Sequence, residues 1–69
     1  MSDNVYAVTK VVGTSKTSIE DAIKNAVSIA SGTLKNLNWF EVKEVRGLID
    51  DDKAAYYQVA LEIGFRYEK

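Results

Sequence analysis

The chain has 69 residues, with ten acidic and nine basic side chains, a net charge of −1, and neither cysteine nor histidine. Its length predicts a single domain over residues 1–69 with a marginal core, and oligomerisation is the route to extra stability that remains without disulfides. The missing residue types exclude thiolate metal sites and remove the commonest metal ligand and general base, and the scattered Lys and Arg predict no nucleic-acid surface.

The N-terminal segment predicts an early strand. Residues 1–4 lack the basic and apolar regions of a signal peptide, and no apolar run reaches the roughly 20 residues that span a bilayer, so a soluble cytoplasmic protein without a membrane partner is expected. Residues 5–12 are rich in β-branched side chains and end at the turn-like run GTS at 13–15. Apolar groups occupy both faces of this strand, and the pattern leaves open which face meets a helix.

A long helix is predicted between residues 19 and 37. Thr17 and Ser18 can each cap its first turn, with an acidic residue three positions later to complete a capping box. Apolar residues then recur at spacings of three and four, which predicts one buried stripe over about five turns, or roughly 28 Å. Ile29 lies off this stripe and is a candidate for contact with another subunit, whereas Gly32 marks either a close approach or early fraying. The stripe comprises Ile19, Ala22, Ile23, Ala26, Val27, Ala30, Thr33, Leu34 and Leu37.

Two alternating segments, residues 39–49 and 54–67, predict a β-hairpin joined by a four-residue polar connection at 50–53. Aspartate tolerates the left-handed backbone that such turns need, so we interpret the three consecutive aspartates as a solvated turn rather than a metal site. Pairing Ile49 with Ala54 sets a register, which a bulge near Arg46 and Gly47 would shift. On one face this register pairs Phe40 with Ile63, Val42 with Leu61 and Glu44 with Val59; on the other it pairs Trp39 with Gly64, Glu41 with Glu62, Lys43 with Ala60 and Val45 with Gln58.

The adjacent aromatic residues Trp39 and Phe40 divide the two faces of this hairpin. Their rings must point to opposite sides of a strand, so we predict that Phe40 faces the helix and that Trp39 is left as an exposed platform for a ligand. The predicted fold is α+β, with order β-α-β-β and a three-stranded antiparallel sheet packed on one long helix. No element covers the second face, which carries Trp39, Val45 and Tyr56, and we expect another copy of the chain to cover it.

Several segments together resemble the dodecin family of small flavin-binding proteins. The run LKNLNWFEV at residues 34–42, followed by VRG at 45–47 and YQVALEIGFR at 57–66, agrees with that family in order, spacing and total length. The similarity extends upstream through VVGTS at 11–15 and EDA at 20–22, so it covers nearly the whole chain without an insertion. The resemblance implies subunits that assemble into a hollow, roughly spherical homododecamer, which stores or sequesters flavin and protects it from light.

The resemblance also implies which residues bind flavin. Two flavins would lie at each two-fold axis, stacked between Trp39 side chains of related subunits, and Gln58 would hydrogen-bond the polar edge of the ring. Arg46 is expected to approach the flavin or its phosphate, and Glu44 to border the site. FMN is the expected flavin, with riboflavin or FAD as alternatives, and some members of the family also bind coenzyme A.

The distance between Trp39 and Gln58 bears on whether one chain can form this site alone. In the predicted register Trp39 and Gln58 share a face but lie six residues apart along the strands. That is roughly 20 Å, so strong twist or a neighbouring subunit must bring both to one ring.

Many bacterial members carry basic residues where this chain has Gly32 and Asn38, and a histidine or other polar group at Leu48. These departures leave the stacking platform intact but leave the phosphate contacts, and so the choice of flavin, open.

Other functional classes fit the residues less well. An enzyme needs an acid, base or nucleophile held in a pocket, and no pair among the carboxylates, lysines and tyrosines is persuasively spaced, so no catalytic residue and no enzymatic activity is predicted. The alternative is a ligand-free structural oligomer or protein-interaction module. Trp39 would then be an interface or core residue, Gln58 a solvent-facing one, and Arg46 the partner of a surface acid such as Glu44, worth about 0–1 kcal/mol.

Overall fold

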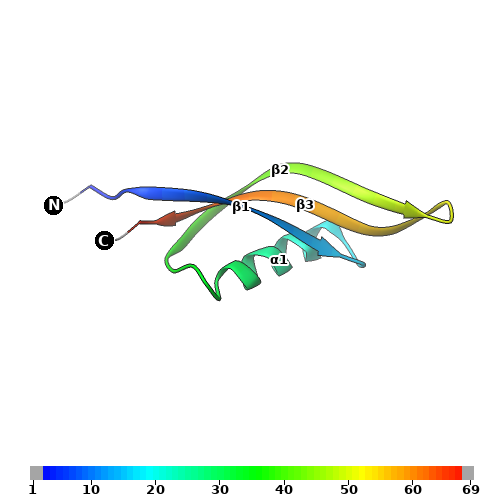
Figure 1. The fold of residues 1–69 in the computed structure, drawn as a ribbon, viewed down its shortest axis with the longest axis horizontal. Helices are drawn as coiled ribbons and strands as arrows, with labels where there is room; N and C mark the ends of the chain where they lie inside the picture. The colour runs from blue at the N-terminus through cyan, green and yellow to red at the C-terminus, as the bar shows by residue number, and fades with distance from the viewer. Residues whose placement is uncertain (1–2, 68–69) are drawn as a thin grey trace.

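The computed structural model describes residues 3–67 as a three-stranded antiparallel sheet with one helix on one of its faces (Figure 1). The elements in chain order are β1 (Tyr6–Ser15), α1 (Ile19–Ala30), β2 (Leu37–Asp50) and β3 (Lys53–Arg66), and β3 is the central strand. The predicted α+β fold with order β-α-β-β is therefore confirmed. The predicted domain ends, residues 1 and 69, lie outside the described residues.

Strand β1 is longer than predicted and continues through the GTS run to Ser15. Its helix-facing positions include Gly13, which is buried because α1 passes directly over it. A Cβ at this position would overlap the carbonyl oxygen of Ala22 and the methyl group of Ala26. Ser15 Oγ then donates a hydrogen bond to Asp21 Oδ2 (2.8 Å), so the end of β1 is tied to the start of the helix. The residues predicted as a turn are thus the strand segment that docks α1.

Helix α1 is shorter than predicted and ends at Ala30 after 12 residues, or about 18 Å. Its start agrees with the prediction, since the Ser18 side chain accepts a hydrogen bond from the backbone N–H of Asp21 (3.0 Å). At the other end the N–H groups of residues 31–34 bond to carbonyls of Val27, Ile29 and Ala30, so the last turn closes around Gly32. Leu34 and Leu37 still pack against the core, but from the turn and the start of β2.

The β2–β3 hairpin is tighter than predicted, because Asp50 pairs with Lys53 and only two residues form the turn. Asp51 and Asp52 both have positive φ angles, 55° and 62°. Positive φ at both central residues is typical of the two-residue turn that matches the twist of antiparallel strands. The predicted four-residue connection is therefore wrong in length, although its solvated aspartates are as expected.

The predicted register is confirmed from Trp39 to Val42 and at Ile49, and it is wrong between them. Trp39 lies opposite Gly64, and Phe40 opposite Ile63. One irregularity falls at Lys43 and a second lies between Leu48 and Ile49, next to the predicted position at residues 46 and 47, so the pairs between them move by one position and the predicted register returns at Ile49. The observed pairs are Glu44 with Ala60, Val45 with Val59 and Arg46 with Gln58, in place of Glu44 with Val59, Lys43 with Ala60 and Val45 with Gln58.

The bulge exchanges which side chains share a face. Val45 now lies with Val59 on the helix side of the sheet, so the prediction that it faces away from the helix is wrong. Glu44 and Arg46 move to the side opposite α1, which we call the open face. Side chains of alternate strand residues point to opposite faces, so this one extra residue decides the composition of the open face.

The core is thin and lies between α1 and the two strands β1 and β3. Phe40 is on the helix side, as predicted, but it is 48% exposed because α1 covers β1 and β3 and leaves β2 uncovered. The molecule extends 56 × 20 × 14 Å, and the β2–β3 hairpin continues beyond the N-terminal end of α1 (Figure 1). Among residues 3–67 no helix is both long and apolar enough to cross a bilayer. The buried apolar residues are Ala22, Ala26, Ala30, Val59, Leu61 and Ile63.

Candidate functional site

All four predicted flavin-binding residues lie on the open face of the sheet. Trp39, Glu44 and Arg46 come from β2, opposite Gly64, Ala60 and Gln58 of the central strand. In the predicted register Glu44 and Arg46 would have faced the helix, so the bulge at Lys43 is what brings them to the side of Trp39 and Gln58. The structure therefore gathers the predicted residues more completely than the sequence indicated.

Trp39 forms the first of two groups on this face. Its side chain lies against Gly64, where an added Cβ would overlap indole carbons Cε2, Cζ2 and Cη2, all of the six-membered ring. The phenol ring of Tyr6 packs beside the indole with ring centroids 5.3 Å apart and planes inclined by 60°. The Trp39 residue is still 43% exposed. An indole that is supported by its own chain and partly free is suited to stack on a second flat ring.

Arg46, Glu44 and Gln58 form the second group. Arg46 lies directly across from Gln58, and its Nη2 is 3.3 Å from Glu44 Oε2. The side chains of this ion pair are 57% and 61% exposed, so the pair contributes about 0–1 kcal/mol to stability. Together with Val12 and Ala60 the three polar residues line a hollow of about 50 Å³. That volume is too small to enclose a flavin, and it presents an amide and two charged groups toward solvent.

The two groups lie far apart within one chain. Trp39 is opposite Gly64 and Arg46 is opposite Gln58, six residues away along β3. At about 3.3 Å per residue this separation is roughly 20 Å. Between the groups the open face carries the charged residues Lys10, Glu41 and Glu62. One chain therefore presents an aromatic half-site and a polar half-site, and it does not bring them to a single small ligand.

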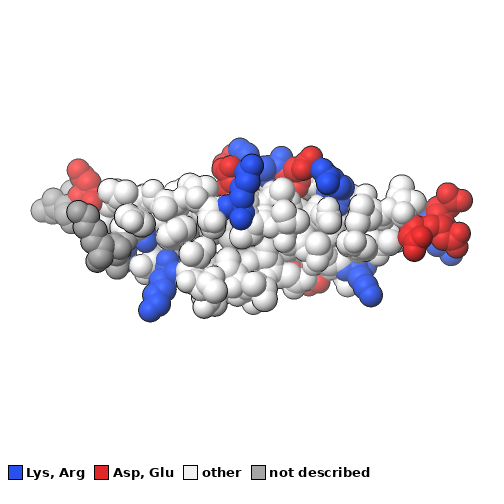
Figure 2. All heavy atoms as spheres, in the orientation of Figure 1, with Lys and Arg blue, Asp and Glu red and all other residues white. Residues whose placement is uncertain are grey.

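Charge is distributed unevenly over the surface. Figure 2 shows carboxylates gathered at the end where the β2–β3 turn lies, and Lys and Arg interspersed with acids elsewhere on the visible face. Within residues 3–67 no group of three or more carboxylates is arranged so that it could hold a metal ion. The aspartates of the turn, residues 50–52, are exposed.

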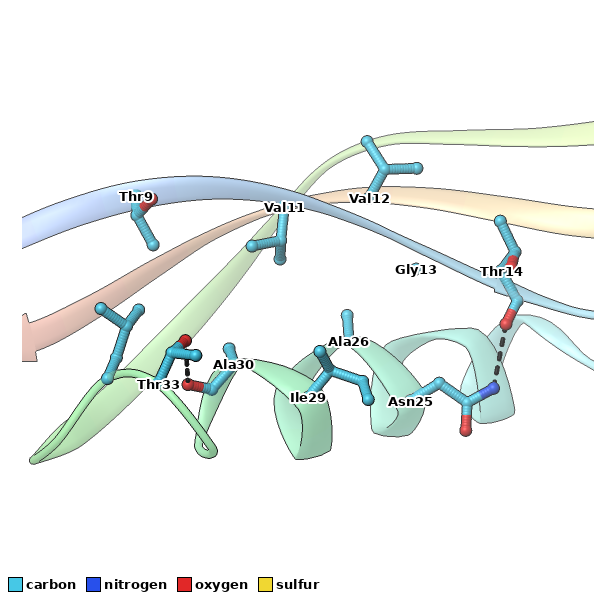
Figure 3. Close-up of a pocket in the computed structure, with 11 residues that line it drawn as sticks. Thr9, Val11, Val12, Gly13, Thr14, Asn25, Ala26, Ile29, Ala30 and Thr33 are labelled. Carbon is cyan, nitrogen blue, oxygen red and sulfur yellow. Dashed lines mark hydrogen bonds between the residues drawn. The ribbon is translucent and has the colours of Figure 1, made fainter.

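A separate hollow of about 490 Å³, lined by both apolar and uncharged polar residues, lies between β1 and α1 (Figure 3). Ile29, the residue predicted to lie off the buried stripe, borders it and is 77% exposed. Asn25 closes one end by donating a hydrogen bond from Nδ2 to the Thr14 carbonyl (2.9 Å). No titratable side chain lines this hollow, so it offers a packing surface and no group for acid–base chemistry.

Sequence reasoning missed two residues that shape the surroundings of Trp39. Tyr6 was one of several apolar residues on a strand whose two faces could not be told apart, and nothing in the sequence connects it to residue 39. Gly64 had a usable signal, because the predicted register already placed it opposite Trp39. A glycine facing a large aromatic side chain across a strand pair leaves space for that ring to lie on the sheet.

Comparison with known proteins identifies the family. The dodecin family model matches residues 5–68. A dodecin from Thermus thermophilus is 49% identical over 65 residues, covering 94% of each sequence. Two solved structures share the fold over nearly their whole length. Dodecin from Streptomyces coelicolor is 52% identical with a TM-score of 0.95, covering 100% of this chain and 99% of that one. Dodecin from Streptomyces davaonensis is 47% identical with a TM-score of 0.94, covering 99% and 100%. The chain therefore belongs to the dodecin family of non-enzymatic flavin-binding proteins.

Proposed function

We propose that this protein stores and sequesters flavin by stacking pairs of flavin rings between Trp39 side chains at interfaces between its own copies. The observation that carries the proposal is the partly exposed Trp39 indole, supported by Gly64 and Tyr6 on a sheet face that no element of the chain covers. Stacking of a heteroaromatic ring on such a platform is worth roughly 1–3 kcal/mol. Stacking between two indoles also shields the flavin from substrates and quenches its excited state, which suits storage and photoprotection.

The polar half-site supplies the contacts that stacking lacks. The Gln58 amide offers one acceptor and two donors, which complement the alternating acceptors and donor along the pyrimidine edge of a flavin. Arg46 pairs with Glu44 at the surface and gives up only a weak interaction if it turns toward a phosphate. We therefore assign Gln58 to the ring edge, Arg46 to the ring or its phosphate, and Glu44 to the border of the site.

A site built this way needs more than one chain. The separation of roughly 20 Å between Trp39 and Gln58 means that the two half-sites on one flavin belong to different copies. The monomer also exposes large apolar residues on its helix side, including Phe40, Val45 and Ile29. Surfaces of this kind, on a chain with so thin a core, favour self-association. We propose a homododecamer, as the family resemblance implies.

The proposed ligand is FMN, with riboflavin and FAD as alternatives that share the same ring. All three offer the stacking surface and the pyrimidine edge, and they differ in the phosphate that Arg46 would meet. Coenzyme A lacks the flavin ring, so the assignment of Gln58 to the ring edge does not extend to it.

The proposal predicts quenching of flavin fluorescence on a large particle. Riboflavin, FMN and FAD are titrated separately into purified protein while flavin emission is followed, and light scattering after size exclusion gives the particle mass. We expect strong quenching that saturates at one flavin per chain on a particle of about twelve subunits, because each flavin stacks on one Trp39. Flavin that stays fluorescent, over a smaller particle, would instead support the ligand-free structural or protein-interaction module.

Gln58→Met is expected to weaken flavin binding about tenfold while leaving the assembly intact. Methionine keeps the length of the side chain but removes the amide, and one lost hydrogen bond of about 1.4 kcal/mol corresponds to a factor of ten in affinity. Leu48→Met is the matched control, since Leu48 lies on the same face two pairs closer to the turn, opposite Tyr56. Equal affinities for the two variants would remove Gln58 from the site.

A further inference from the structure

Tyr6 and Trp39 come from opposite edge strands and meet across the central one. Tyr6 lies on β1 opposite Arg66, and Trp39 lies on β2 opposite Gly64. Edge strands on either side of a central strand are separated by about 10 Å, so contact requires a side chain to reach over β3. The indole does so by passing over Gly64, and it ends beside the Tyr6 ring at a centroid distance of 5.3 Å.

We propose that Tyr6 is a positioning residue that, together with Gly64, fixes the orientation of the Trp39 indole before flavin arrives. This inference rests on the proposed function and adds a residue to it. Gly64 supports the indole from below, since any side chain there would occupy the space of its six-membered ring. Tyr6 limits it from the side through a tilted aromatic contact, the arrangement that ring quadrupoles favour.

The physical consequence is a pre-organised stacking surface. A tryptophan on an open sheet face can rotate about two side-chain bonds, and flavin binding would have to freeze that motion. A residue that freezes it beforehand raises affinity without touching the ligand. Each flavin pair would lie between two Trp39 indoles, one from each of two copies of the chain. A substitution that loosens Trp39 would therefore weaken the stacking on both sides of the pair.

The protein has a single tryptophan, so its fluorescence reports Trp39 alone. The experiment compares wild type, Tyr6→Ala, Tyr6→Phe and the control Tyr67→Ala. Tyr67 is another tyrosine near the same end of the sheet, where its N–H donates to the Val5 carbonyl, and it is 59% exposed. Two properties of the flavin-free assembly are measured, the fluorescence anisotropy of Trp39 and its quenching by acrylamide, followed by FMN affinity.

For Tyr6→Ala we expect lower anisotropy, more efficient acrylamide quenching and about three- to tenfold weaker FMN binding, the size of one aromatic contact. Tyr6→Phe keeps the ring and should retain wild-type values in all three measurements, as should Tyr67→Ala. Wild-type anisotropy and quenching in Tyr6→Ala would overturn the inference. The inference would also be overturned if Tyr6→Phe lost as much anisotropy and FMN affinity as Tyr6→Ala, because the hydroxyl group rather than the ring would then hold Trp39 in place.

Gly64→Ala gives a second test if Tyr6→Ala fails to assemble. The three atoms nearest to the added methyl group all belong to the movable end of the Trp39 side chain, so the sheet should tolerate it while the indole is displaced. We expect a changed Trp39 emission spectrum and weaker FMN binding; an unchanged spectrum and affinity would overturn the inference. The fluorescence measurements need no flavin, so a wild-type protein that binds none would refute the proposed function while the positioning of Trp39 is still tested.

Discussion

Trp39→Ala is expected to assemble normally and to bind flavin about 10- to 100-fold more weakly than the wild-type protein. The loss corresponds to roughly 1–3 kcal/mol of ring stacking on the Trp39 indole. The fold should tolerate the change, because Trp39 lies outside the cluster of buried residues and is 43% exposed. The measurement is an FMN titration followed by flavin quenching, with particle mass determined on the same sample.

Phe40→Ala is the matched control for this prediction. Phe40 is the next residue in β2, is also an exposed aromatic (48%), and faces the helix side of the sheet. The Phe40→Ala substitution removes a similar amount of exposed aromatic surface and leaves the open face unchanged. Where both variants keep the wild-type particle mass, only Trp39→Ala should release flavin fluorescence. Equal losses in the two variants would show that the open face is not the stacking surface.

The sequence predicts the elements of this fold well because their signals are local. Ser18 and the acids after it define the helix start, and the alternation around residues 39–42 fixes the first half of the hairpin register. The helix end was mispredicted for a physical reason. Leu34 and Leu37 continue the apolar spacing and are indeed packed on the core, but they reach it after the chain has left the helix at Ala30. Periodicity reports burial, and burial alone does not require a helix.

The composition of the candidate site depends on a bulge at one residue, and the sequence gives no indication of that bulge. Lys43 looks like any polar residue in an alternating strand, yet the bulge there moves Glu44 and Arg46 onto the open face. The contact between Tyr6 and Trp39 joins two strands that are not paired with each other, and no local pattern encodes it. The proposed closure of the flavin site between copies of the chain is a different kind of prediction, because no single chain can test it. It was inferred from a distance too large for one subunit, and the same distance separates the half-sites in the structure.

Gly13→Ala is expected to be the most destabilising of the conservative glycine substitutions in this chain. The new methyl group would overlap the backbone carbonyl oxygen of Ala22 and the side chain of Ala26, so α1 would have to move away from β1. Overpacking of this kind costs about 1–3 kcal/mol and occasionally more. A 69-residue domain has roughly 3–10 kcal/mol of stability in total, so the loss is a large part of it.

Gly47→Ala separates this close approach from the general effect of replacing glycine in a strand. A Cβ at Gly47 would meet only Tyr57 Cδ1, at 4.0 Å, which is ordinary contact, so stability should change by less than about 0.5 kcal/mol. Urea unfolding of both variants is compared at one protein concentration, because the proposed assembly would make the midpoint concentration-dependent. The helix presents Ala22, Ala26 and Ala30 to the sheet and contributes no large side chain to the fully buried core. If Gly13→Ala and Gly47→Ala unfold at the same urea concentration, the helix must be able to shift without loss, and the core of a single subunit is then held chiefly by its neighbours.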